Sequence, residues 1–132
     1  MRQEDREFLL KDLCARLPYG VKCENYNHID GRNVFKVTDI RDNGYICGTV
    51  NNHYCWAVFD PLELKPYLFP LSSMTEEQKM FLKQQNWCIA ISTSGTIETT
   101  IEGIDWLNKN HFDYRGLIEK GLAIDATGLN IY

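Results

Sequence analysis

Apolar side chains recur at helical spacing through residues 4–17, and charged side chains fill the positions between them. The apolar positions are Phe8 or Leu9, Leu10, Leu13, Cys14 and Leu17. Pro18 follows directly, and a residue before proline is pushed out of the helical region. The pattern therefore predicts an amphipathic N-terminal helix, within residues 1–18, that packs on a core.

The pattern changes between residues 19 and 70, where short segments are rich in β-branched and aromatic residues and alternate roughly between polar and apolar. These segments are GVKCENY, NVFKVTDI, YICGTV and YCWAVFD. Asn43-Gly44 between two of them predicts a hairpin with a type I′ turn, which needs positive φ at both central residues. Such a meander usually curls to hide its edges, so we predict a small antiparallel barrel of the SH3-like kind.

The segment KPYLFPLSSMTEEQ, residues 65–78, joins the predicted barrel to a helix. Pro66 and Pro70 each lack a backbone donor, which is tolerated at a sheet edge, so we expect residues 65–70 to form an edge strand. Two overlapping capping boxes follow, Ser73 with Glu76 and Thr75 with Gln78, and predict a helix start.

The remaining pattern predicts a mainly helical extension over residues 71–132. We expect a helix to about residue 85, a buried strand at 87–93, a helix at 98–110 and a short helix at 113–121 that Asp113 caps and Gly121 ends. The sequence thus predicts one α+β domain over residues 1–132: an N-terminal helix, a small SH3-like barrel at 19–70 and a helical C-terminal half.

Charge and composition narrow the function classes. The net charge is −4, and none of the segments 1–18, 19–70 and 71–132 is basic, so we expect no nucleic-acid partner. No apolar run reaches the roughly 18 residues of a membrane span, so we expect no membrane partner. Five cysteines without a secretory leader are typical of a cytoplasmic protein with reduced thiols.

Three segments together resemble a known family. They are DLCARLPYGVK at 12–22, KPYLFPLSSMTEEQ at 65–78 and IDWLNKNHFDYRGLIEKGLAIDAT at 104–127, about half of the chain. They are similar to short proteins, without an assigned activity, of gut bacteria and their phages and prophages. The resemblance implies a phage or prophage origin, a cytoplasmic setting and a non-catalytic role.

Cys47, His53 and Cys55 are the nearest approach to a metal site in the sequence. Zinc takes four ligands, commonly from paired C-x-x-C knuckles, whereas the spacing here is C-x5-H-x-C. Cys23 and His28 complete a set only if the fold brings them near. We therefore expect core thiols and a turn histidine, with no metal and no cofactor.

Enzyme chemistry has little support in the sequence. A Cys–His nucleophile needs a base within hydrogen-bond reach and an orienting third group, and no nucleophile-elbow motif is present. The segment STSGTIETT at 92–100 has hydroxyl groups before a predicted helix. An anion or ligand site there would use Ser92, Ser94 and Thr96, with Arg115 as the cation.

Aromatic residues in the predicted barrel carry the binding hypothesis, because a small barrel encloses few rings and the others face outward. The predicted binding face is Tyr45, Tyr54, Trp56 and Tyr67. We expect a non-enzymatic binding or adaptor module that contacts a host or phage protein, with homo-oligomerisation open. The alternatives are a small-molecule or nucleotide binder that sequesters host signals and, third, a small hydrolase with a Cys/His pair.

Overall fold

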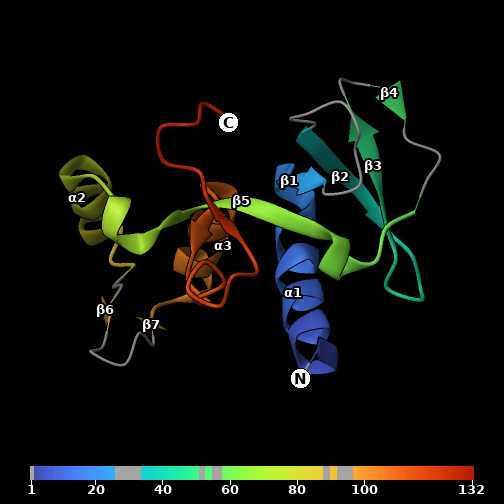
Figure 1. Ribbon diagram of the computed structural model, residues 1–132. Coiled ribbons are helices and arrows are strands. Elements are labelled where there is room, and N and C mark those ends of the chain that lie inside the picture. The colour runs from blue at the N-terminus through green and yellow to red at the C-terminus, as the bar shows by residue number, and fades with distance from the viewer. Residues whose placement is uncertain (1, 26–33, 51–52, 55–57, 88–89, 92–96) are drawn as a thin grey trace.

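The computed structural model describes residues 2–25, 34–50, 53–54, 58–87, 90–91 and 97–132 of the chain. The protein is α+β, with an N-terminal helix, a mixed sheet and further helices after the sheet, as the sequence predicts. Figure 1 shows the long strand β5 (Leu64–Pro70) crossing the molecule, with the preceding strands near one end and the helix that follows it in the chain beyond the other. This strand joins the two halves of the fold.

The N-terminal helix α1 (Arg2–Arg16) continues into a 3-10 turn, η1 (Leu17–Tyr19). Leu9 and Leu13 are buried against the sheet, as their spacing predicts. Cys14 is exposed, so its predicted place on the buried stripe is wrong. Asp12 and Arg16 are completely buried instead, which the apolar pattern did not reveal.

The sheet runs in the order β4-β3-β2-β1-β5-β8, with β9 also pairing with β5. The first strands are β1 (Lys22–Asn25), β2 (Val34–Ile40), β3 (Ile46–Val50) and β4 (His53–Tyr54), all paired antiparallel. Two later strands, β8 (Phe112–Asp113) and β9 (Ile124–Asp125), pair with β5 in parallel. Within the described residues no pairing joins β4 back to β5 or β8. The sheet is therefore not closed, and the predicted SH3-like barrel is not confirmed.

The strand β5 lies inside the sheet, so its predicted place at an edge is wrong. Its two prolines, Pro66 and Pro70, are accommodated because alternate residues of a strand direct their backbone groups to the same side. Both prolines therefore face the same neighbour as Leu68. The Leu68 carbonyl accepts from Ala126 N–H on the β9 side, whereas Phe69 N–H donates to His111 on the β8 side. Both proline nitrogens therefore face the β9 side, where β9 pairs only with Tyr67 and Leu68.

The hairpin between β2 and β3 forms where the sequence predicts it, but with a different turn. Gly44 N–H donates to Arg41 O, and Arg41 N–H donates to Tyr45 O across the loop. Gly44 alone has a positive φ, of 84°, and Asn43 does not. This is a three-residue loop with one left-handed glycine, so the predicted type I′ turn is wrong.

Two helices follow β5 and the 3-10 turn η3 (Leu71–Ser73): α2 (Glu76–Gln84) and α3 (Ile101–Lys109). The Thr75–Gln78 capping box forms as predicted, with both reciprocal hydrogen bonds. The Ser73 hydroxyl donates to the Pro70 carbonyl instead of capping a helix, so the first predicted box is wrong. Between the helices, the short strands β6 (Ala90–Ile91) and β7 (Ile97–Glu98) pair antiparallel.

The predicted helix at 113–121 is a series of turns. Asp113 still caps this segment, because its carboxylate accepts from the backbone N–H groups of Arg115, Leu117 and Ile118. Gly116 has a φ of 74°, in the left-handed region, which a helix interior excludes. The C-terminal half is thus less helical than predicted, and it contributes β8 and β9 to the sheet.

Two clusters of buried side chains result. The sheet core packs α1 against β1, β2, β3 and β5, and it is mainly aliphatic with Phe35 and Phe59 in edge-to-face contact. The smaller aromatic cluster lies between α2, α3 and β8, around Leu82, Leu107 and Phe112. In the part of the chain that the structure describes, no helix has the length and apolar character needed to cross a membrane.

Candidate functional site

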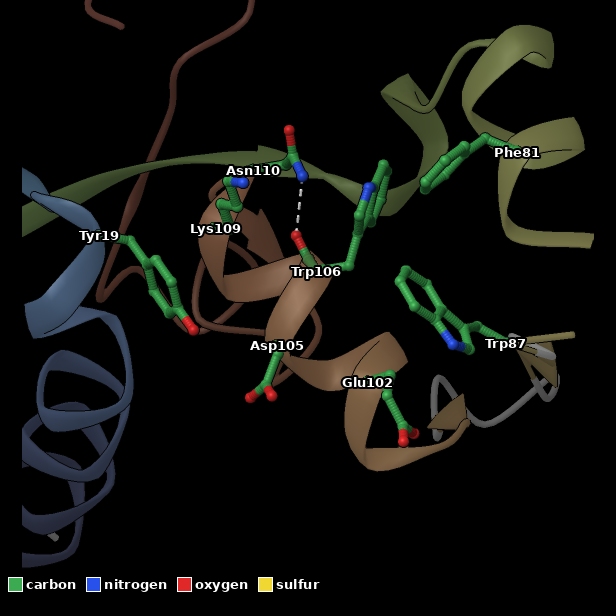
Figure 2. A pocket seen from close by; sticks show the side chains of 8 residues that line it. All are labelled: Tyr19, Phe81, Trp87, Glu102, Asp105, Trp106, Lys109 and Asn110. Atoms are coloured by element: carbon green, nitrogen blue, oxygen red, sulfur yellow. Dashed lines mark hydrogen bonds between the residues drawn. The ribbon is translucent and has the colours of Figure 1, made fainter. Parts of the chain in front are cut away.

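A cleft of about 510 Å³ opens beside the aromatic cluster, between α2 and α3 (Figure 2). We call it the aromatic cleft. Three side chains from different segments, Phe81, Trp87 and Trp106, lie on one side of it. Its lining residues are Tyr19, Phe81, Trp87, Glu102, Asp105, Trp106, Lys109 and Asn110.

The rings of the cleft pack on one another in a continuous row. Phe81 meets Trp87 edge to face, with centroids 5.9 Å apart, and lies 6.3 Å from Trp106 at an angle of 29°. Trp106 in turn stacks on the buried Phe112, at 5.6 Å and 12°. The row is anchored at its buried end and open at Phe81, whose exposed fraction is 40%. The open rings are therefore held in place before any partner arrives.

Local backbone geometry places two of these rings. Asn86 ends α2 in the left-handed conformation, with a φ of 59°. Asn86 N–H donates to Lys83 O, and Trp87 N–H donates to Leu82 O. These two bonds form a Schellman motif, which turns the chain back over the last helical turn and brings Trp87 against Phe81.

The helix α3 supplies the charged groups of the cleft. Thr100 caps the helix by accepting from Gly103 N–H, and Asn110 ends it with its side chain donating to Trp106 O. Glu102 and Asp105 are exposed along this helix, and Lys109 follows one turn after Asp105. Within the described residues, neither carboxylate forms an ion pair. The cleft therefore carries two carboxylates and one ammonium group.

A second cluster of charged groups lies buried between α1 and the C-terminal segment. Arg16 forms a two-point ion pair with Asp12, at 2.8 and 3.2 Å, and donates to Phe112 O at 2.6 Å. Arg115 lies 3.2 Å from the same Asp12 carboxylate. The Tyr114 ring is flanked by both guanidinium groups, with centroid distances of 5.3 and 5.1 Å. The network ties α1 to the C-terminal segment.

Arg115, which the sequence suggests as a cation for a bound anion, is thus engaged with Asp12 and Tyr114. Its predicted partners Ser92, Ser94 and Thr96 lie outside the described residues. Sequence reasoning missed Asp12 and Arg16 because their i,i+4 spacing is also that of an ordinary surface pair.

Tyr132 bridges β1 and β5 through its hydroxyl group. Its hydroxyl accepts from Lys22 N–H and donates to Tyr67 O, both at 2.9 Å, in place of a direct ladder bond. The Tyr132 ring stacks on His111, with centroids 3.6 Å apart. Burial, with the nearby Arg16 and Lys22, lowers the pKa of His111 to about 4, so the imidazole is neutral at pH 7.

The described cysteines give little support to a nucleophile. The Cys23 thiol is completely buried, and burial together with the nearby Asp12 carboxylate raises its pKa, which disfavours the thiolate. Cys47 is buried and accepts a hydrogen bond from Arg41 Nε, at 3.1 Å.

The predicted metal set is only partly visible. His53 is exposed on the edge strand β4, and Cys55 lies outside the described residues. Among the residues that the structure describes, no group of three or more His, Cys, Asp and Glu side chains is placed to hold a metal ion.

The predicted aromatic face of the sheet is not assembled as expected. Tyr45 is exposed at 36%, but Tyr67 is buried at 4%. Tyr54 lies on β4, and Trp56 falls outside the described residues. The exposed rings that do gather in space are those of the aromatic cleft, and none of them belongs to the binding face predicted from the sequence. The available signal was two aromatic residues, Phe81 and Trp87, on either side of one helix end.

Comparisons with protein-family models, with curated proteins and with solved structures gave no match to this chain. The function is therefore inferred from the geometry of the aromatic cleft.

Proposed function

We propose that this protein is a non-enzymatic binding module and that the aromatic cleft is its binding site. The observation that supports this proposal is the row of rings, anchored on Phe112 and open at Phe81. Partly exposed Trp and Phe side chains that are already ordered lose little conformational entropy on binding. Trp is also strongly enriched among the residues that dominate interface energetics.

The partner class that we propose is a protein. The apolar surface of the cleft reaches the molecular surface at Phe81, which is exposed at 40%. The aromatic rings come from three segments of the chain and spread over a surface, which suits a polypeptide. Because the sequence resembles short proteins of gut bacteria and their phages, we propose a host or phage protein as the partner.

The alternative of a nucleotide binder has no specific observation in its favour. Its proposed cation, Arg115, is already paired, and the aromatic cleft carries more acidic than basic side chains. Phosphate groups prefer the opposite balance of charge.

Selection from a random peptide display library tests the proposed function, and the Phe81→Ser variant serves as the comparison. We expect wild-type protein to enrich peptides that shift the indole N–H signals of Trp87 and Trp106 in NMR spectra. The Phe81→Ser variant should not enrich these peptides, because Phe81 lines the cleft.

Tyr45→Ser is the matched control, since Tyr45 has nearly the same exposed fraction as Phe81 but lies on the β2–β3 hairpin. It should enrich the same peptides as the wild type. Peptides lost with Tyr45→Ser and kept with Phe81→Ser would instead place the binding site on the sheet, and absence of any enrichment over Phe81→Ser would contradict the proposal.

A further inference from the structure

We propose that the aromatic cleft receives an arginine side chain from a basic segment of a partner protein. This inference deepens the proposed function and rests on it. It assigns the ligand's charge and shape, which the aromatic row alone leaves open.

The lining of the cleft is acidic. Glu102 and Asp105 lie one turn apart on α3 and are exposed, and neither has a cationic partner among the described residues. Glu102 in the first turn is favourable for the helix itself, but Asp105 lies beyond the reach of that effect. Lys109 balances only one of the two carboxylates. The lining of the cleft therefore has a net charge of −1, and a cation entering it gains attraction.

The aromatic rings of the cleft also favour a cation as the ligand. The faces of Trp and Phe attract cations, with Trp the strongest, and the attraction grows as the cation loses water. Figure 2 shows Glu102 on the same side of α3 as Trp87, whereas the Asp105 side chain points away from the three rings. A cation on the exposed face of Trp87 would therefore lie on the Glu102 side of the helix, and Asp105 would add its charge from further away.

Elsewhere in the described part of the molecule, guanidinium groups already contact a ring and a carboxylate together. In the buried network the guanidinium groups of Arg16 and Arg115 flank the ring of Tyr114 and share the Asp12 carboxylate. The aromatic cleft offers the same two kinds of group, rings and carboxylates, without a guanidinium of its own. A guanidinium suits them better than an ammonium because it is planar, weakly hydrated and able to stack and to pair in two points at once.

The size of the cleft favours a protein segment over a free cation. A volume of about 510 Å³ is far larger than one guanidinium group, and Phe81 extends the apolar surface to the rim. Apolar residues beside the arginine would cover these rings, whereas a free guanidinium would leave them exposed to water.

Titration with two pentapeptides tests the inference. Both are acetylated and amidated and have leucines on either side of a central residue, which is arginine in one and citrulline in the other. Citrulline keeps the shape of arginine and removes its charge. We expect the arginine peptide to shift the Trp87 and Trp106 indole signals and to bind at least tenfold more tightly than the citrulline peptide.

The variant arm removes the cleft's charge. In Glu102→Gln with Asp105→Asn, the arginine peptide should bind about tenfold more weakly, and its advantage over the citrulline peptide should disappear. Glu4→Gln with Glu119→Gln makes the same change in net charge at exposed positions that do not line the cleft. That control should bind like the wild type.

The outcomes separate the two proposals. Equal binding of the two peptides, or library peptides that are neutral, would overturn the arginine inference and leave the binding function standing. If N-acetylarginine amide bound as tightly as the arginine peptide, the flanking residues would contribute nothing. That result would overturn the inference that the arginine belongs to a protein segment. A library without enriched peptides would overturn the binding function itself. Because the citrulline comparison needs no variant, the inference stays falsifiable even if a variant folds poorly.

Discussion

The sheet core and the aromatic cluster are built from similarly apolar residues, yet only the first is sealed. In the sheet core, Leu13, Phe35 and Leu68 have no exposed surface, because α1 covers one face of the strands. In the aromatic cluster, Leu107 is equally buried, but Phe81 keeps 40% of its surface exposed and the Trp87 and Trp106 rings are partly exposed. The difference indicates that the sheet core stabilises the fold, whereas the outer rings of the second cluster remain available for contact.

The largest expected effect is on the free energy of unfolding when one phenylalanine in each region is replaced by alanine. Phe35→Ala should lower the free energy of unfolding by about 4 kcal/mol, since it empties a completely buried site beside Phe59. Phe81→Ala should lower it by about 1 kcal/mol, because much of that ring already contacts water. Urea denaturation followed by circular dichroism measures both. Equal losses would show that the aromatic cluster is a second folding core, and would weaken the binding proposal.

The next effect concerns the buried ion pair that ties the two regions together. Asp12→Asn should cost about 3 kcal/mol, because it leaves two guanidinium groups without a carboxylate. The double variant Asp12→Leu with Arg16→Met should cost less than the single change, since no buried charge is then left unpaired on α1. Thermal and urea unfolding of the three proteins give the comparison. A double variant less stable than Asp12→Asn would mean that the network contributes net stability through its geometry.

The smallest expected effect is a dependence on pH that arises in the sheet half. The folded pKa of His111 is about 4 and its ordinary value is 6.5, so the unfolded chain takes up the proton first as the pH falls. The stability that neutral His111 contributes is complete above pH 6.5 and is lost as the pH falls from there toward 4.

The His111→Asn variant isolates this effect, because asparagine tolerates the φ of 61° at this position. Between about pH 7.5 and pH 5, the melting temperature of the wild type should fall further than that of His111→Asn. Parallel curves for the two proteins would contradict the assignment to His111.

Local signals in the sequence predicted much of the fold. Helical spacing gave α1, the Thr75–Gln78 box gave the start of α2, and Asn43-Gly44 gave the position of a hairpin. Each of these features depends on side chains and backbone groups within a few residues of one another. The chain therefore encodes them wherever its distant parts lie.

Several features predicted wrongly depend on distant segments. The strand β5 was expected at an edge because of Pro66 and Pro70, but β9 pairs with it only from Tyr67 to Leu68 and leaves the nitrogen of Pro66 unopposed. Tyr67 was expected on an exposed face because a small barrel encloses few rings, and it is buried. Strands of two residues, such as β8 and β9, form only because a long strand is already present to pair with them.

The sequence by itself determined the class of the fold, its local elements and an acidic chain without a recognisable catalytic motif. The tertiary structure decided which side chains share a site. Phe81, Trp87 and Trp106 come together because a Schellman turn and the packing of α3 on β8 bring them there. Asp12 and Arg16 became a buried pair only because the C-terminal segment, through Phe112 and Arg115, covers them. Burial is a property of the whole fold, and spacing along one helix cannot report it.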